Sequence, residues 1–296
     1  MQNGADEARE SIPDSANECA ISVVIPFLNA ESTIAEQLTA VLLQELDAAF
    51  EVVVVDHGST DDSALVVGSF AERDPRVRLI DGSALARGGQ GPPRNFGVQV
   101  SQAPLVAFCD ADDIVQPGWL HAIVEALRAG ARCVAVTLDY WALNPGYRES
   151  GYPQLIAVVD GASGALAIER ELYLAVGGFD ETVWPMADYD FCLRLKRDFG
   201  IVPVRLAEAV IWYRVRVGLR AQFQRSRLQG QSAAGVRWRR SEPPPQSTAR
   251  RLVWSASRLP YLLTPRRVMW VKNSAFTLGL VEWNVWRRLS RGVSKP

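Results

Sequence analysis

Strand-like and helical segments alternate along the first 141 residues, and this order leaves few folds open to the chain. Short runs rich in Val and Ile predict buried strands, and the amphipathic segments between them predict helices. The five predicted strands span residues 20–27, 50–56, 77–81, 104–110 and 131–141. Strands and helices that alternate in this way form a mostly parallel sheet with helices on both faces. We therefore expect an α/β fold.

Carboxylates stand where two of these strands end. Asp56 closes the second strand, and Asp110, Asp112 and Asp113 follow the fourth. Ligands of parallel α/β sheets bind beyond the carboxyl ends of the strands, and carboxylate oxygens are ligands for Mg²⁺ or Mn²⁺. Alternation along an extended chain predicts that Asp110 and Asp112 share one side, while Asp113 points elsewhere and caps the following turn. The alternative is a capped turn before Pro117 with no cation.

Charge is divided unevenly along the chain. From Arg205 onward there are 19 Lys or Arg and 3 Asp or Glu, whereas the preceding part has 13 and 30. The two parts are therefore expected to have different partners. The basic part contains no recognisable nucleic-acid-binding module, so we expect no nucleic-acid partner. The four cysteines lack paired spacing, which indicates reduced thiols and a cytoplasmic location.

Six motifs occur in the order typical of glycosyltransferase family 2, which the chain resembles over residues 20–216. They are VVIPFLNAEST, EVVVVDHGSTDDS, RNFGV, FCDADD, GGFDE and DYDFCLRL. The resemblance implies the GT-A fold, a Rossmann-like, mostly parallel sheet flanked by helices. It also implies inverting transfer of a sugar from a nucleoside-diphosphate sugar to a hydroxyl acceptor.

The same resemblance implies a division of the chain. A nucleotide-sugar half is expected over residues 20–141 and an acceptor half over 142–216. A polar tail at 1–19, without the apolar core of a signal peptide, is expected to be disordered. A basic helical extension is expected over 217–296, with a Pro-rich linker near its middle at 241–251.

Roles for individual residues follow from the resemblance as well. It implies donor binding by Pro26, Asp56, His57, Arg94, Asp110 and Asp112. Among these, Asp112 would be the ligand of Mg²⁺ or Mn²⁺, and Asp110 would lie near the ribose. Asp56 would lie near the base, and Arg94 near the base and phosphates. Asp188 takes the place of the general base that removes the acceptor proton; the alternative is an N-cap of its own helix.

The chain departs from the family pattern at three places. His57 stands where many members have a second Asp, so it either contacts the base or is a surface turn residue. Ala187 replaces the Glu that often precedes the catalytic Asp, and no His stands near Trp212 to complete a metal site. The basic residues Arg214 and Arg216 can share the charge neutralisation instead.

Residues 224–228, QRSRL, approach the QxxRW motif of processive polysaccharide synthases, but Leu228 replaces the Trp. No run of about 18 apolar residues predicts a membrane-spanning helix that could form a channel, so we expect non-processive transfer. The candidate diphosphate contacts are Arg214, Arg216, Gln224 and Arg227. The alternative is a solvated basic face of a helix.

Tryptophans and arginines are interleaved over residues 250–296, which is typical of segments that bind anionic membrane surfaces. This predicts peripheral attachment at the inner face of the membrane. The family resemblance implies synthesis of a cell-envelope polysaccharide or glycolipid on a saccharide or lipid-linked acceptor. The alternative is that Trp254, Trp270, Trp283 and Trp286 pack on the domain or form a homodimer interface.

Two other functions compete with glycosyl transfer. A sugar-phosphate nucleotidyltransferase needs a Gly-rich basic loop after the first strand, and PFLNAEST contains no Gly and no basic residue. A non-catalytic nucleotide-binding or membrane-binding protein of the same fold is the stronger alternative, because the chain lacks the family's Glu and His.

Overall fold

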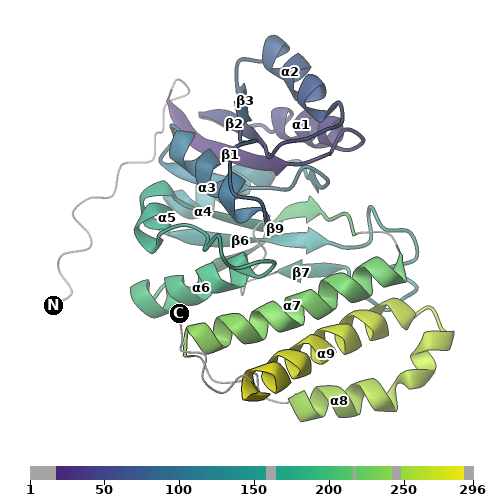
Figure 1. Ribbon diagram of the computed structural model, residues 1–296. Helices are drawn as coiled ribbons and strands as arrows, with labels where there is room; N and C mark the ends of the chain where they lie inside the picture. The colour runs from purple at the N-terminus through teal and green to yellow at the C-terminus, as the bar shows by residue number, and fades with distance from the viewer. Residues whose placement is uncertain (1–17, 158–164, 216–217, 242–247, 290–296) are drawn as a thin grey trace.

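The computed structural model in Figure 1 describes residues 18–157, 165–215, 218–241 and 248–289. Within these residues a sheet of nine strands has the order β3-β2-β1-β4-β8-β6-β9-β5, and β7 pairs with β6. The strands are β1 (Cys19–Phe27), β2 (Ala49–Asp56), β3 (Val77–Asp81), β4 (Leu105–Phe108), β5 (Ile114–Val115), β6 (Cys133–Asp139), β7 (Leu155–Ala157), β8 (Leu166–Glu169) and β9 (Val204–Trp212). The helices are α1 (Ile34–Leu42), α2 (Ser63–Arg73), α3 (Gly91–Val100), α4 (Trp119–Arg128), α5 (Arg170–Val176), α6 (Ala187–Phe199), α7 (Leu219–Arg239), α8 (Thr248–Ser257), the 3₁₀ helix η2 (Leu259–Leu263) and α9 (Arg267–Leu289).

The first half of the sheet is parallel, as the alternation predicts. β1 pairs in parallel with both β2 and β4, and β2 pairs in parallel with β3. Because side chains alternate along a strand, Val52 and Val54 pack in one core and Val53 and Val55 in the other. Residues of α1, α2 and α4 complete the first core, and residues of α3, α5 and α6 complete the second. The predicted α/β fold with helices on both faces is confirmed.

Beyond β4 the sheet becomes mixed. β8 is antiparallel to β4 and β6, whereas β9 is parallel to β6. After β7 the chain forms β8 and, directly behind it, α5. The predicted fourth strand ends at Phe108 rather than Asp110, and the short strand β5, which the sequence pattern did not indicate, pairs with β9. The acidic loop is therefore held at both ends by the sheet.

The predicted basic helix is confirmed as α7, and α9 lies alongside it (Figure 1). The two helices approach closely because Gly230 and Gly279 lack side chains: a Cβ at either position would overlap a backbone carbonyl of the other helix. The ring centroids of Trp238 and Trp283 lie 5.8 Å apart between the same helices. Arg240, after α7, pairs with the buried Asp190 of α6 at 2.6 Å. The first two contacts join the helices of the extension to each other, and the ion pair of Arg240 attaches the extension to α6.

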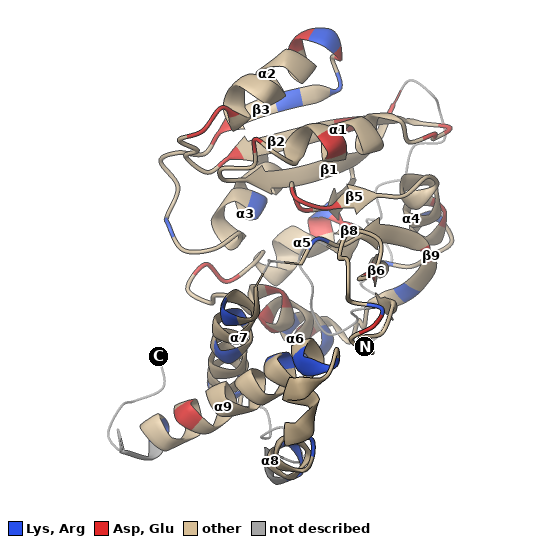
Figure 2. Cartoon of the chain, turned by 90° about the vertical axis from the view of Figure 1, so that its right-hand side faces the viewer, with Lys and Arg blue, Asp and Glu red and all other residues tan. Residues whose placement is uncertain are grey.

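Some expectations fall outside the described part of the chain, namely most of the N-terminal tail at 1–17 and Arg216. Figure 2 shows Lys and Arg gathered on α7, α8 and α9 and acidic residues along the loops at the strand ends. Among the described helices, none is both long and apolar enough to cross a membrane.

Candidate active site

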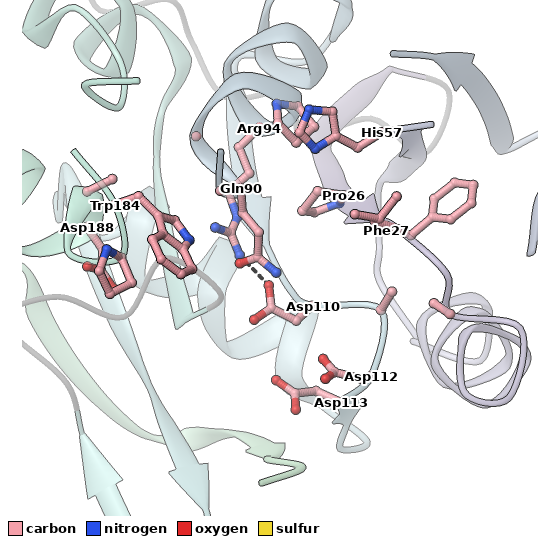
Figure 3. Close-up of a pocket in the computed structure, with 18 of the residues that line it drawn as sticks. Pro26, Phe27, His57, Gln90, Arg94, Asp110, Asp112, Asp113, Trp184 and Asp188 are labelled. Carbon is pink, nitrogen blue, oxygen red and sulfur yellow. Dashed lines mark hydrogen bonds and ion pairs between the residues drawn. The ribbon is translucent and has the colours of Figure 1, made fainter. Parts of the chain in front are cut away.

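A cavity of about 700 Å³ opens beyond the carboxyl ends of β1, β2 and β4. Figure 3 shows that Pro26 and His57 lie on one side of it, Trp184 and Asp188 on the opposite side, and the acidic turn below. Helix α7 contributes part of the wall. The structure thus brings residues of both predicted halves and of the basic extension to one cavity.

The acidic residues after β4 form a turn and not an extended segment. The backbone N–H of Asp113 donates to the carbonyl oxygen of Asp110 at 3.4 Å. The turn brings the carboxylates of Asp110, Asp112 and Asp113 together, with one oxygen of each within 4.8 Å of the others. The prediction that Asp113 points elsewhere is wrong, because the alternation of side chains holds only for an extended chain. Its carboxylate accepts the backbone N–H of Arg214 at 2.8 Å instead of capping the following turn.

A buried glutamine of α1 holds this turn in place. The side chain of Gln37, on α1, donates to the carbonyl oxygen of Asp110 at 3.0 Å and accepts the N–H of Val115 at 3.0 Å. It thereby bridges the two ends of the acidic loop. On the outer side, Arg214 donates from Nε to the carbonyl oxygen of Asp112 at 2.8 Å. These contacts reach backbone groups of Asp110, Asp112 and Val115, so they hold the turn without using the carboxylates.

Electrostatics at the cluster favour a bound cation. Burial raises the pKa of Asp113 well above its usual range, and the neighbouring charges of Asp110 and Asp112 raise it further. Three carboxylates so close together share one site only at a cost unless a positive charge offsets their repulsion. The oxygen-only donor set is the kind that Mg²⁺ and Mn²⁺ prefer, so the residues present fit such an ion.

Arg94 supplies part of that positive charge. Arg94 lies in the first turn of α3, and only 2% of its surface is exposed. Its guanidinium forms an ion pair with the carboxylate of Asp110. Figure 3 marks this contact at the centre of the cavity. Arg94 therefore orients Asp110, and Asp112, the exposed member of the cluster, also lines the cavity.

His57 lines the cavity, whereas Asp56 is not among the lining residues. The carboxylate of Asp56 accepts the backbone N–H groups of Gly58 and Ser59 at 3.1 and 2.8 Å, so it shapes the turn that carries His57. His57 Nε2 lies 3.0 Å from the carbonyl oxygen of Ala86 and donates to it, because a carbonyl oxygen only accepts. In the neutral ring the other nitrogen is then an acceptor. His57 therefore lies on the wall of the cavity, on the turn that Asp56 shapes.

Asp188 lies on the cavity wall in the first turn of α6. The residue at the N-cap position is Met186, which makes no side-chain capping bond, so Asp188 does not serve as the N-cap. Its carboxylate accepts the N–H of Tyr189 at 2.7 Å. Trp184 lies beside it and faces the cavity (Figure 3). The carboxylate is thus placed where a reacting group in the cavity could meet it.

Arg225, on α7, is a cavity residue that the sequence reasoning missed. Burial alone lowers its pKa, but Tyr213 and the nearby carboxylates, Asp110 first, raise it above its usual value. Within the part of the chain that the structure describes, no hydrogen bond or ion pair engages its guanidinium. A half-buried cation that lines an acidic cavity and has no partner among the described residues is a candidate ligand for an anion.

The four predicted diphosphate contacts are placed differently from one another. Arg214 lines the cavity, but its guanidinium donates to the acidic turn and, at 3.0 Å, to Glu36. Gln224 does not line the cavity, and Arg227 pairs with Glu282 of α9 at 2.7 Å. Arg216 lies outside the described residues. The residues of α7 that line the cavity are instead Arg225 and Gln229.

Comparison with known proteins agrees with this geometry. The sequence profile described as "Glycosyl transferase family 2" matches residues 22–175, which is more than half of the chain. The chain belongs to glycosyltransferase family 2. The succinoglycan biosynthesis protein ExoU of Rhizobium meliloti is 35% identical over 36% of this chain and 30% of its own length. ExoU and three other curated relatives are matched over about a third of their own length.

Solved structures share the fold of this family 2 chain. The mannosyltransferase PcManGT of Pyrobaculum calidifontis, in complex with GDP-Man and Mn²⁺, has a TM-score of 0.65 and 18% identity, with 95% of this chain and 92% of that one covered. S. aureus TarS 1–349, in complex with UDP-GlcNAc, has a TM-score of 0.55 and 16% identity over 90% and 92%. At such identities the likeness establishes the GT-A fold and nothing finer.

Proposed function

We propose that this chain is an inverting, non-processive glycosyltransferase that uses a nucleoside-diphosphate sugar and a divalent cation. The observation that carries the proposal is a single cavity with the carboxylate cluster at one wall and Asp188 at the opposite one. Structural neighbours that bind GDP-Man with Mn²⁺ and UDP-GlcNAc support the choice of donor class. Relatives such as ExoU support a role in making a cell-envelope polysaccharide or glycolipid.

In this proposal the chain's own residues divide the work of one displacement. Asp188 accepts the proton of the acceptor hydroxyl as the hydroxyl oxygen bonds to the anomeric carbon. The bond from that carbon to the nucleoside diphosphate breaks, and its electron pair leaves with the diphosphate. Attack from the face opposite the leaving group inverts the configuration. Arg225 donates to the leaving diphosphate from the α7 side.

The cation belongs at the carboxylate turn. Asp112 and Asp113, with Asp110 oriented by Arg94, would hold Mg²⁺ or Mn²⁺. When bound, the ion offsets negative charge that develops on the leaving diphosphate. His57 and Pro26, across the cavity, are placed to contact the donor nucleotide.

The domain assignment follows from the same arrangement. We assign donor binding to residues 20–141 and acceptor binding to 142–216 together with part of the extension. The extension at 217–296 is not separate from catalysis, because its first helix brings Arg225 to the cavity.

Donor hydrolysis tests the whole proposal: Mn²⁺-dependent release of GDP from GDP-mannose or UDP from UDP-GlcNAc is expected. Donor binding without hydrolysis or transfer would favour the non-catalytic alternative.

We predict that Arg225→Met raises the KM for the donor by about 10- to 100-fold, because a hydrogen bond to a charged group contributes about 1.5–3 kcal/mol. Met retains the length of the side chain without the charge. The matched control is Arg220→Met, an exposed position on α7 away from the cavity. Steady-state kinetics with varied donor measure the effect. An unchanged KM in Arg225→Met would remove this residue from the donor site.

We also propose that the outer face of the extension attaches the enzyme to the inner, cytoplasmic face of an anionic membrane. Leu252, Val253 and Leu263 are 50%, 68% and 93% exposed, and Arg251 and Arg258 lie among them. Apolar side chains beside cations suit a lipid–water interface. A homodimer interface is the competing use of the same surface.

Replacing both Leu252 and Val253 by Ser is expected to weaken binding to phosphatidylglycerol liposomes by about tenfold or more, since exposing such side chains to water costs about 1.5–3 kcal/mol each. Co-sedimentation at low salt measures the binding. The matched control replaces Leu43 and Leu65, which are 74% and 73% exposed near α1 and α2. Equal liposome binding by all three proteins would reject membrane attachment, and a loss of dimer in the first variant would favour the interface. Point variants are preferable to deletion of 246–296, because that deletion would uncover the face of α7 that packs on α9.

A further inference from the structure

A second hollow, of about 1140 Å³, adjoins the catalytic cavity. Its lining includes Asp112 and Arg214, which also line the first cavity, so the two spaces meet at the exposed side of the carboxylate turn. Its other walls are the loop after β6, the first turns of α7, and the corner between η2 and α9. We call this hollow the acceptor groove, for the role argued below.

The acceptor groove is largely apolar. Leucine, proline and valine side chains from all three walls line it: Leu143, Pro145, Leu219, Leu262, Leu263 and Val268. Leu263, which lines the groove, is 93% exposed. A contiguous exposed apolar surface of this kind marks a place where something apolar binds.

The polar side chains of the groove are already engaged within the protein. The amide of Asn144 donates to the carbonyl oxygens of Tyr140 and Tyr213 and accepts the N–H of Val215. Gln222 accepts the hydroxyl of Tyr147 at 3.0 Å. Few groups therefore remain to bind the hydroxyls of a saccharide chain.

The charged groups of the groove are Asp112, Glu149, Arg214 and Arg267. Asp112 belongs to the cation site, and Arg214 is bonded to the acidic turn and Glu36. Among the described residues, no hydrogen bond or ion pair engages the guanidinium of Arg267, at the start of α9. Its neighbour Arg266 does not line the groove and donates to the hydroxyl of Tyr261 at 3.1 Å. This corner therefore suits an anionic group next to an apolar chain.

We propose that the groove binds the acceptor substrate, and that this acceptor is an amphiphile with an apolar chain joined to its reactive end through a phosphate. The inference rests on the proposed function. The apolar chain of the acceptor lies along the leucines of η2 and α7, and its phosphate lies near Arg267. Its hydroxyl end enters the catalytic cavity past Asp112. Leu263 both lines the groove and is the most exposed of the apolar residues that we assign to the membrane surface, so such an acceptor could enter without leaving the lipid.

Decyl phosphate, used below its micellar concentration, is a suitable probe, and isothermal titration calorimetry on the full chain measures its binding. We expect it to bind at least tenfold more tightly than inorganic phosphate or decanol. Replacing both Leu219 and Leu262 by Ser should weaken its binding at least tenfold, and Arg267→Ala severalfold. Leu219 and Leu262 are 37% and 39% exposed, so neither belongs to the core. A melting temperature within a few degrees of wild type confirms that each variant is folded.

The matched control is Val253→Ser, since Val253 is an exposed apolar residue of the same extension outside the groove. If Val253→Ser and the groove variant lose the same affinity for decyl phosphate, the probe adheres to exposed apolar surface in general. That result would overturn the inference. Binding of maltotetraose that decyl phosphate displaces would reassign the groove to a saccharide. Mn²⁺-dependent donor hydrolysis should survive in the groove variants. If wild type hydrolyses the donor but does not bind decyl phosphate, the inference fails alone; if wild type neither hydrolyses nor transfers, the proposed function fails.

Discussion

Asp188→Asn is expected to lower the rate of sugar transfer by about 10²–10⁴-fold while the donor still binds, because a positioned general base contributes about that factor. The amide keeps the shape of the side chain and can still accept the N–H of Tyr189, but it cannot take a proton from the acceptor. Since Met186 and not Asp188 holds the N-cap position, α6 should remain intact.

The matched control is Asp198→Asn, which changes an exposed carboxylate near the other end of α6 that pairs with Arg197. Thermal shift with GDP or UDP and Mn²⁺ reports donor binding, and product formation reports transfer. Full transfer by Asp188→Asn would place the base elsewhere. A loss of nucleotide binding in the same variant would show that Asp188 holds the donor rather than the acceptor proton.

The fold of the first half could be predicted because each strand is a local pattern. Runs such as VVVV in β2 are buried on both faces, and such runs are typical of parallel sheets with helices on each side. The same local logic failed at Asp113. Its direction depends on a turn closed by Asp110 and on the distant residues Gln37 and Arg214, none of which the spacing of the acids encodes.

Arg225 shows the same limit on a helix. The resemblance of residues 224–228 to a known motif pointed to Gln224 and Arg227, but the phase of α7 is set by its packing on α9. Gly230, where α9 approaches closely, is three residues beyond Arg227, and residues three apart share a helix face. Arg227 therefore faces Glu282, while Arg225 and Gln229, four apart, face the cavity. A glycine inside a predicted helix was the available signal for the packed face.

Asp112 is the carboxylate whose replacement best tests cation binding. Its backbone carbonyl oxygen accepts the N–H of Arg214 Nε and so holds the outer side of the turn. The exposed carboxylate can be removed without disturbing that bond. Asp113 is a poorer choice, because its buried carboxylate also holds the backbone of Arg214 and its loss would disturb the turn. A change at Asp112 therefore tests binding of the ion separately from folding.

We expect Asp112→Ala to abolish detectable Mn²⁺ binding in the presence of GDP or UDP and to lower transfer by about a thousandfold, since a bound metal contributes several kcal/mol of charge stabilisation. Calorimetry with Mn²⁺ and assays of transfer measure the two effects, and excess EDTA should reproduce the second in wild type. The matched control is Asp81→Ala, an exposed carboxylate at the end of the neighbouring strand β3. An undiminished transfer rate in Asp112→Ala, or in the wild-type protein with excess EDTA, would contradict the metal role. It would mean that Arg94 and Arg225 neutralise the diphosphate without an ion.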